Sequence, residues 1–321
     1  MGQTMKAANI KDRLLGYLFG SACGDALGRP VEHFSLEEIK ARYGEKGILE
    51  IPPDSPWTDD TQVMLVLARA LLRGAELEPE EFMSILSEEF VKWLDEPDLG
   101  AGETCKGAAF RLREGFHWRE SGIKESKKCG SLMRSGILGF IYRNDPEKLL
   151  EIASLSGKIS HCHPTANAAC IAGAYAVKLA LDGVRPEEMF SPLLKVTAGI
   201  SAEFTEAFEG AYELAQGDLG DEEALRKIGQ GWDAEETFAL SCFCMLRYPD
   251  DYKKTVQTAV NITGDSDSVG AVAGGIMGAR LGLEALPENW IKALRGKETL
   301  EDMVGPLLEK YERVSTKAGK A

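Results

Sequence analysis

The sequence predicts an all-α fold, a compact orthogonal multi-helix globule. Apolar residues recur at helical spacing along most of the 321 residues, and no repeat or low-complexity tract interrupts them. Strand signals are scarce. The only candidate strand, residues 47–51, is short and is followed at once by Pro52 and Pro53.

The helices can be placed in chain order from their apolar stripes and start signals. Apolar stripes predict helices around 14–19, 63–71, 82–94 and 149–155, the last after the start signal Asn144-Asp145-Pro146. Residues 166–181 are rich in alanine and carry only Lys178 before their end, which predicts a central, buried helix. Further helices are expected around 203–215, 221–229, 234–246, 249–261, 268–282 and 298–312, and loops at 44–58, 95–104 and 119–130.

Charge and composition exclude several classes of function. The formal net charge of −14 argues against a nucleic-acid surface and against docking to an anionic membrane. The longest apolar run, 269–279, is too short to span a bilayer, and the first twelve residues lack the apolar core of a signal peptide. Seven cysteines without a CxxC pair indicate a reduced protein with buried thiols and give little support to a zinc site. We therefore expect a cytoplasmic protein.

Two acidic clusters lie where helices are expected to begin. The first is Trp57-Thr58-Asp59-Asp60-Thr61-Gln62, and the second is Gly264-Asp265-Ser266-Asp267-Ser268-Val269-Gly270. Capping of a helix N-terminus would by itself explain such residues. The second cluster, however, opens a helix with glycines at 270, 274 and 278, a spacing that favours close packing against another backbone.

Close packing would bury these carboxylates, and buried carboxylates are costly unless cations accompany them. No lysine or arginine lies within several residues of either cluster, and the first to follow them are Arg69 and Arg280. A shared site for a hard metal ion such as Mg²⁺ is therefore the natural interpretation. An EF-hand is excluded because Ile276 stands where its glutamate is needed, and an aspartyl phosphatase would need a strand before the second cluster.

A third segment, residues 20–32, has glycines at 20, 24 and 28, which again indicates close helix contact. Its end is a turn that presents Glu32, either to the acidic clusters or to solvent. Because the two acidic clusters must meet in space, we expect one domain at 12–312, with a flexible N-terminus at 1–11 and a flexible tail at 313–321.

The segments that carry chemistry resemble, together and in order, the ADP-ribosylglycohydrolase family of the dinitrogenase-reductase-activating type. They cover about residues 12 to 285, and each is weak when taken alone. Besides the two acidic clusters they are Gly24-Asp25-Ala26-Leu27-Gly28 with Glu32, Pro97-Asp98-Leu99-Gly100-Ala101-Gly102-Glu103-Thr104, Cys129-Gly130-Ser131-Leu132-Met133-Arg134, Ser160-His161-Cys162-His163-Pro164-Thr165-Ala166 and Gly231-Trp232-Asp233-Ala234-Glu235-Glu236.

The resemblance implies an all-α fold with a dinuclear cleft for two Mg²⁺ ions, Mn²⁺ being the alternative. It implies the metal ligands Thr58, Asp59, Asp60, Asp265, Asp267 and Ser268, the last replacing a threonine of many relatives. Glu32, Asp98 and Asp60 would be the catalytic residues. Glu32 would position or deprotonate the attacking water. Asp98 would meet the ribose from the other side, or would simply form a turn.

The resemblance also implies a set of substrate-binding residues: Gly100, Gly102, Thr104, Cys129, Gly130, Ser131, Arg134 and His161. Many relatives carry asparagine at the position of Cys129, so hydrogen bonding there is expected to differ. A nucleophilic Cys129 is not expected because the metal mechanism needs none. Arg134 has a structural alternative, His163 is expected to cap the following helix, and Trp232 is expected to pack rather than to stack on adenine.

The activity implied is Mg²⁺-dependent hydrolysis of the glycosidic bond between ADP-ribose and a protein side chain, with arginine favoured. The alternatives are a serine-linked or other O-linked substrate, a non-catalytic ADP-ribose binder on the same fold, and a dimetal phosphohydrolase. The expected partner is an ADP-ribosylated protein or a small molecule containing ADP-ribose, with no nucleic acid and no membrane. We expect a monomer, with a dimer as the alternative.

Overall fold

The computed structural model describes residues 7–319, which form an all-α globule without a strand in that range, as the sequence predicts. Seventeen α-helices and three short 3-10 helices make up the described chain. None of the described helices is long and apolar enough to cross a membrane. The elements are α1 (Ala7–Gly28), η1 (Arg29–Val31), α2 (Leu36–Tyr43), α3 (Asp59–Gly74), α4 (Pro79–Trp93), α5 (Glu103–Arg113), α6 (Trp118–Ser121), η2 (Cys129–Ser131), α7 (Gly136–Ile141), α8 (Pro146–Lys158), α9 (Pro164–Leu181), α10 (Pro186–Thr197), α11 (Ala202–Gln216), α12 (Asp221–Ile228), α13 (Ala234–Arg247), α14 (Tyr252–Val260), α15 (Ser266–Leu281), η3 (Leu283–Ala285), α16 (Glu288–Ala293) and α17 (Lys297–Ala318).

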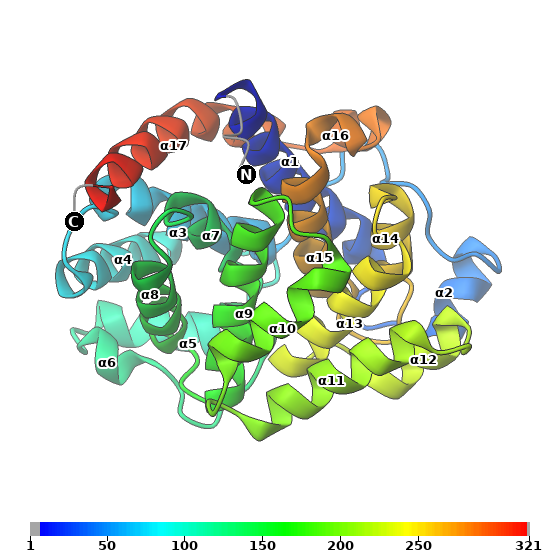
Figure 1. Cartoon of the computed structure of the whole chain (residues 1–321). Coiled ribbons are helices and arrows are strands. Elements are labelled where there is room, and N and C mark those ends of the chain that lie inside the picture. The colour runs from blue at the N-terminus through cyan, green and yellow to red at the C-terminus, as the bar shows by residue number, and fades with distance from the viewer. Residues whose placement is uncertain (1–6, 320–321) are drawn as a thin grey trace.

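Helices α1 and α15 form the closest contact of the fold, and they run antiparallel (Figure 1). Their glycines meet in pairs, with Gly20 against Gly274 and Gly24 against Gly270. A Cβ atom on any of these residues would overlap the backbone of the opposite helix. The close helix contact predicted from the glycine spacing is therefore confirmed. It brings the start of α15 beside the end of α1, where Gly28 lies against the backbone of Asp267.

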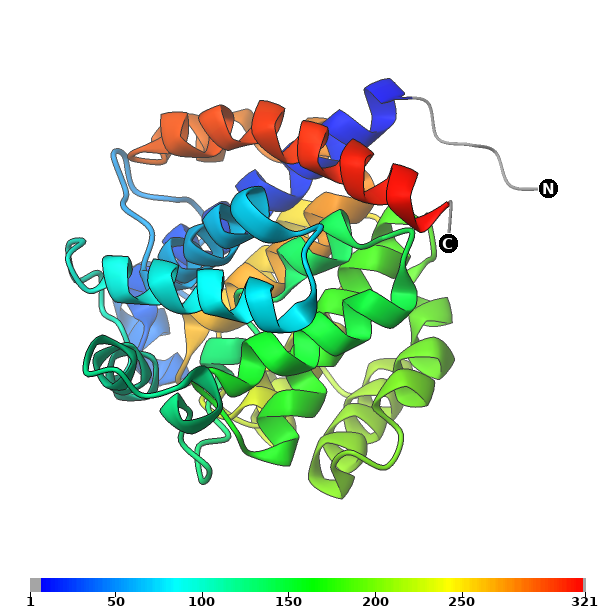
Figure 2. The same ribbon diagram turned by 90° about the vertical axis from the view of Figure 1, so that its left-hand side faces the viewer.

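The remaining helices pack around this pair. Helix α9 is buried along nearly its whole length between α7, α8, α10, α13 and α15, as its alanine-rich composition predicts. Helices α3, α4 and α5 pack in sequence on one side, and α11 packs against α13 on another. Figures 1 and 2 show α17 lying across α1, α3 and α7 at one face of the molecule.

The structure shows the loop expected at 44–58 in place of the candidate strand at 47–51, and it differs from the expectation at the two ends of the chain. Residues 47–51 form no strand, because the side chain of Asn261 binds both the backbone N–H and the carbonyl of Ile48, at 2.8 and 2.9 Å. Helix also extends into both ends expected to be flexible, since α1 begins at Ala7 and α17 continues to Ala318. The outermost positions of those two end segments, 1–6 and 320–321, lie outside the described residues.

Candidate metal centre and adjoining cavity

Asp25, near the end of α1, fixes the start of α3. It is completely buried, and its carboxylate accepts hydrogen bonds from the backbone N–H of Thr58 at 2.8 Å and of Thr61 at 3.1 Å. The hydroxyl of Thr61 donates a third, at 2.6 Å. Burial raises the pKa of Asp25 to about 6, although these bonds favour its charged form. Asp25 thus holds the first acidic cluster in place from the neighbouring helix.

The first acidic cluster forms the first turn of α3. Thr58 is the N-cap, and its hydroxyl oxygen accepts the N–H of Asp60 at 3.2 Å. Asp59 and Asp60 follow in the first turn, where the helix dipole favours negative charge. The hydroxyl of Thr58 also lies 3.1 Å from one carboxylate oxygen of Asp60. The other oxygen, Oδ1 of Asp60, is buried and has no hydrogen-bond partner among the described residues.

The second cluster begins α15 without performing a capping role. Asp265 occupies the N-cap position, yet its side chain makes no capping hydrogen bond. It instead accepts a hydrogen bond from the thiol of Cys129 at 3.0 Å. Asp267 lies in the first turn of α15 and accepts the N–H of Ser268 at 3.1 Å. Capping alone therefore does not account for the carboxylate of Asp265.

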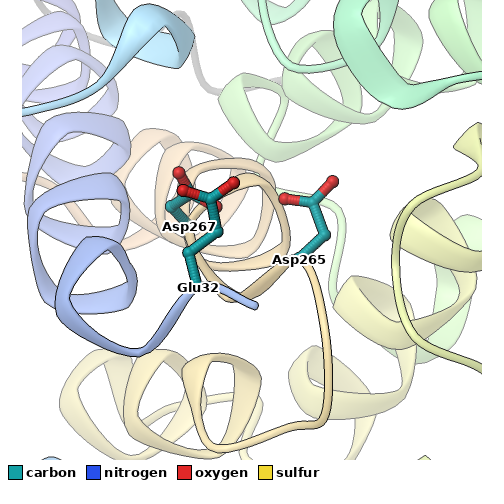
Figure 3. A group of neighbouring side chains, drawn as sticks. All are labelled: Glu32, Asp265 and Asp267. Carbon is teal, nitrogen blue, oxygen red and sulfur yellow. The ribbon is translucent and has the colours of Figure 1, made fainter. Parts of the chain in front are cut away.

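Backbone pairing places Glu32 beside the second cluster. The N–H of His33 donates to the carbonyl of Gly264 at 2.9 Å, and the N–H of Gly264 donates to the carbonyl of Phe34 at 3.2 Å. Carboxylate oxygens of Glu32, Asp265 and Asp267 consequently lie within 4.8 Å of one another. Figure 3 shows the three carboxyl groups pointing to the same side. Glu32 therefore faces the acidic clusters and is not a solvated loop residue.

Electrostatics in this cluster are strongly unfavourable for bare carboxylates. Burial, followed by the charges of Asp25 and Asp265, raises the pKa of Asp59 to about 7. Burial, followed by the charges of neighbouring carboxylates, raises the pKa of Asp60 and of Asp267 well above the usual range. A positive charge is needed to hold these groups ionised together.

The two arginines nearest in sequence do not supply that charge. Arg69 is bound to Glu89 and Glu96 at 3.3 and 2.7 Å. Arg280 is bound to Asp250 at 2.7 Å and to the carbonyl of Pro249. Within the described part of the chain no lysine or arginine forms an ion pair with Asp60, Asp265 or Asp267. Such buried oxygens, among them the unpartnered Asp60 Oδ1, fit a divalent metal ion that prefers hard ligands.

A cavity of about 310 Å³ adjoins these acids. Four predicted metal ligands and five predicted substrate residues line it: Asp59, Asp60, Asp265, Ser268, Gly102, Thr104, Cys129, Gly130 and His161. The other lining residues are Glu103, Cys105, Lys128, Met133 and Trp232. The ring of Trp232 also stacks on His33, with centroids 4.7 Å apart, so it contributes both to packing and to the cavity wall.

Burial fixes the protonation state of two cavity residues, Cys129 and His161. Burial and the charges of Asp265 and Asp60 raise the pKa of the Cys129 thiol well above its usual range, so Cys129 is a hydrogen-bond donor and not a thiolate. His161 is buried, and burial together with Arg134 lowers its pKa well below the usual range. The imidazole is therefore neutral, with Nδ1 2.8 Å from the hydroxyl of Ser160.

Seven residues predicted for the site do not line this cavity. Glu32, Thr58 and Asp267 belong to the acidic clusters beside it, and the other four are Asp98, Gly100, Ser131 and Arg134. The guanidinium of Arg134 is buried and binds the carbonyls of Gly130 and Ser156 and the hydroxyl of Ser160. Ser131 is fully buried and donates to the carbonyl of Ala166 at 3.4 Å. Both residues therefore support the loop from beneath, which is the structural alternative for Arg134.

Asp98 forms a turn in this structure. Its Oδ1 accepts the N–H groups of Gly100 and Ala101 at 3.1 and 3.0 Å, and its Oδ2 accepts Lys106 at 3.1 Å. Lys106 and these N–H groups hold the pKa of Asp98 below its usual range. Asp98 lines a separate cavity of about 170 Å³. Asp25, by contrast, belongs to the site but is absent from the predicted site residues, and only its place between Gly24 and Gly28 could have indicated it.

Comparison with known proteins gives a consistent result. A family model described as ADP-ribosylglycohydrolase matches residues 6–317. The chain is 30% identical over 311 residues to an uncharacterized protein of Archaeoglobus fulgidus, covering 95% of this chain and 99% of that protein. It is 27% identical over 300 residues to ADP-ribosyl-(dinitrogen reductase) glycohydrolase of Rhodospirillum rubrum, covering 90% and 92%. A solved structure described as an ADP-ribosylglycohydrolase-related protein complex superposes with a TM-score of 0.76, at 29% identity and covering 96% and 99%.

Proposed function

The chain belongs to the ADP-ribosylglycohydrolase family, and on that premise we propose that it is a metal-dependent hydrolase that releases ADP-ribose from a modified protein side chain. The observation that carries the proposal is the convergence of carboxylates from three separate segments beside one cavity: Glu32 after α1, the start of α3 and the start of α15. The Rhodospirillum rubrum relative, named for its action on a modified protein, supports a protein substrate.

The proposed cofactor is a pair of Mg²⁺ ions, with Mn²⁺ as the alternative. The proposed ligands are Thr58, Asp59, Asp60, Asp265, Asp267 and Ser268, and Glu32 lies beside them. All of these residues except Asp59 are buried, and none of their carboxylates forms an ion pair with a lysine or arginine within residues 7–319, which supports this choice. When bound, the ions would hold and polarise the hydroxyls of the ribose, which lowers the barrier to cleavage at its anomeric carbon.

Glu32 is the proposed base. Its carboxylate is half-buried, and burial raises its pKa, which makes it a stronger base than an exposed glutamate. It would orient a water molecule toward the anomeric carbon and accept its proton as the bond to the side chain breaks. The transition state has oxocarbenium character. Asp98 has no direct role in this scheme, because its carboxylate is occupied in a turn.

The start of α5 is the proposed diphosphate site. Gly102 is the N-cap of α5 and supplies no capping side chain, so the first N–H groups of the helix remain free to bind an anion. Gly102 and Thr104 both line the cavity, as do Gly130 and His161 from the opposite loops. The cavity volume of about 310 Å³ is within the usual range for a small-molecule site.

Arginine is the favoured linkage because carboxylates surround the cavity. Glu103 is almost fully exposed where it lines the cavity, Glu32 lies beside the proposed metal ligands, and the ligand Asp59 lines the cavity itself. The negative electrostatic potential of these carboxylates attracts a positively charged guanidinium leaving group, whereas it does not attract a neutral serine hydroxyl. An O-linked substrate remains the alternative to be tested directly.

The deciding experiment measures free ADP-ribose released from arginine-ADP-ribosylated protein, first with Mg²⁺ and then with EDTA. Release that depends on the metal is the expected result. Release from serine-linked protein alone would show that the enzyme acts on O-linked substrates. Phosphate or AMP as the product would indicate a phosphohydrolase. No release from either substrate would indicate a non-catalytic ADP-ribose-binding protein.

A further inference from the structure

A second cavity lies away from the candidate metal centre and shares no lining residue with it. Its volume is about 430 Å³, and it lies between α2, the loop that follows α2, α12 and α14. Figure 1 shows these three helices grouped at one edge of the molecule. The volume is that of a small-molecule site.

The walls of this cavity are held in place without any ligand. Asn261 binds Ile48 through both its N–H and its carbonyl, and Gln257 donates to the carbonyl of Leu49 at 2.8 Å. These bonds attach the loop to α14. Across the opening, Lys40 of α2 binds Glu222 of α12 at 2.5 Å. Side-chain hydrogen bonds and one ion pair therefore hold the cavity walls in place before a ligand binds. This reduces the conformational entropy that the protein would lose on binding.

A buried polar atom in the cavity wall lacks a partner. Thr258 lines the cavity and is only 7% exposed, and its hydroxyl makes no hydrogen bond among the described residues. A buried hydroxyl without a partner costs free energy, so a ligand that bonds to it gains that free energy on binding. Leu36 and Leu225, both buried, supply apolar surface in the same wall.

The uncompensated charge of the cavity is positive. Lys46 and Lys254 line it, and neither forms an ion pair within the described part of the chain. The ammonium of Lys254 lies over the ring of Tyr248, 5.2 Å from its centroid. Two of the three lining carboxylates have cationic partners: Glu222 is bound to Lys40 and Arg226, and Asp221 lies 3.8 Å from Arg247 and also accepts the hydroxyl of Tyr248. The third, Glu45, forms no ion pair among the described residues, so one unpaired carboxylate stands against two unpaired lysines.

We propose that this cavity is a binding site for a small organic anion. Its acidic group would lie between Lys46 and Lys254, its hydrogen-bonding edge would meet the hydroxyl of Thr258, and its apolar body would contact Leu36 and Leu225. The chain as a whole carries a net charge of −14, so two lysines without ion pairs in one cavity are an uncommon place for an anion to bind on this surface. The proposal does not rest on the activity of the other site.

The test uses phenyl phosphate as the probe and isothermal calorimetry on the full-length, Mg²⁺-loaded protein. Phenol and inorganic phosphate, which carry only one half of the probe's chemistry, are the comparison ligands. The wild-type protein should bind phenyl phosphate at least tenfold more tightly than either. Addition of EDTA should leave this affinity unchanged, which separates the site from the metal centre.

Variants locate the binding. Lys46→Gln combined with Lys254→Gln should weaken phenyl phosphate at least tenfold, and both side chains are exposed, so the fold should persist. Thr258→Val should weaken it several-fold without lowering the unfolding temperature of the ligand-free protein. Lys292→Gln, on α16, is the control and should change nothing. Absence of binding, equal binding by the double variant, or loss of binding in EDTA would each overturn the proposal.

Discussion

Gly24 of α1 lies against Gly270 of α15 so closely that a Cβ on either residue would overlap the carbonyl oxygen of the other. The same contact recurs one turn away between Gly20 and Gly274. At the end of the row, a Cβ on Gly28 would lie 2.5 Å from the Cα of Asp267. The glycine contact thus places the acids near the end of α1, Asp25 and Glu32, beside those at the start of α15, Asp265 and Asp267.

Gly24→Ala should therefore destabilise the protein strongly, because the opposing atom is backbone and cannot rotate away. Overpacking in a rigid core costs about 1–3 kcal/mol, and the upper end is expected here. Chemical denaturation measures the loss. Gly210→Ala is the matched control: it lies within α11 with open space around it, and should gain about 0.5–1 kcal/mol from helix propensity. Equal stability of the two variants would contradict the close contact.

The metal-free protein should lose stability as the pH rises. Burial and neighbouring carboxylates raise the pKa of Asp59 from 3.8 to about 7, so the folded state binds a proton more tightly than the unfolded state. The stability contributed by this proton is complete below about pH 4 and is lost as the pH rises through 7. Unfolding temperatures in EDTA at pH 5 and pH 7.5 should show the loss, and Asp59→Asn should reduce it.

Mg²⁺ should restore the stability that the metal-free protein loses. An ion that binds only the folded state stabilises it in proportion to the logarithm of its concentration over its Kd. Protons compete for the same carboxylates, so the rise in unfolding temperature on adding Mg²⁺ should be larger at pH 7.5 than at pH 5. An equal rise at both pH values would show that the ion binds elsewhere.

Arg134→Lys should damage the loop at 129–131 without touching the cavity directly. The guanidinium binds Gly130, Ser156 and Ser160 at once, and lysine cannot reproduce three bonds in that geometry. A loss of about 2–3 kcal/mol in the free energy of unfolding is expected, since buried acceptors would be left unpaired. Arg295→Lys, at an exposed ion pair with Asp54, is the control and should change stability by less than about 0.5 kcal/mol.

Local patterns in the sequence predict most helices, because a helix that buries one face must carry apolar residues at intervals of three or four positions. They leave residues 47–51 open between a short strand and the loop expected at 44–58. The loop is found, because Asn261, more than 200 residues away, binds the backbone groups that a strand would use. They also do not mark Asp25 of α1 as a site residue, because its partners, Thr58 and Thr61, lie at the start of α3. Glu32 could be singled out as the acid of a turn, but its pairing through Gly264 depends on tertiary contact.

Cys129 should be dispensable as a nucleophile. Burial and two carboxylates hold it as a thiol that donates to Asp265. Cys129→Ser keeps a donor and should retain kcat within about tenfold, because hydrogen bonds of this kind contribute about 1–2 kcal/mol. The wild-type thiol should also react slowly with iodoacetamide at pH 7. Complete loss of turnover in Cys129→Ser with intact metal binding would instead assign the thiol a chemical role.

The variants Glu32→Gln and Asp267→Asn should distinguish a residue that acts as the base from a residue that binds the metal. Both residues contribute to the same group of carboxylates, but Glu32 is half-buried in a turn whereas Asp267 is buried at the start of α15. Glu32→Gln keeps an oxygen ligand and removes the base, so kcat should fall at least about 100-fold while Mn²⁺ affinity, measured by electron paramagnetic resonance, changes less than about tenfold.

Asp267→Asn should have the opposite signature. It removes one of several mutually repelling buried carboxylates, so the protein should unfold at a higher temperature in EDTA than the wild type. The same variant should lose most of its Mn²⁺ affinity, and with it the stabilisation that the ion confers. If Glu32→Gln instead abolished Mn²⁺ binding and Asp267→Asn spared it, Glu32 would be a principal metal ligand and the base would have to be sought elsewhere in the cavity.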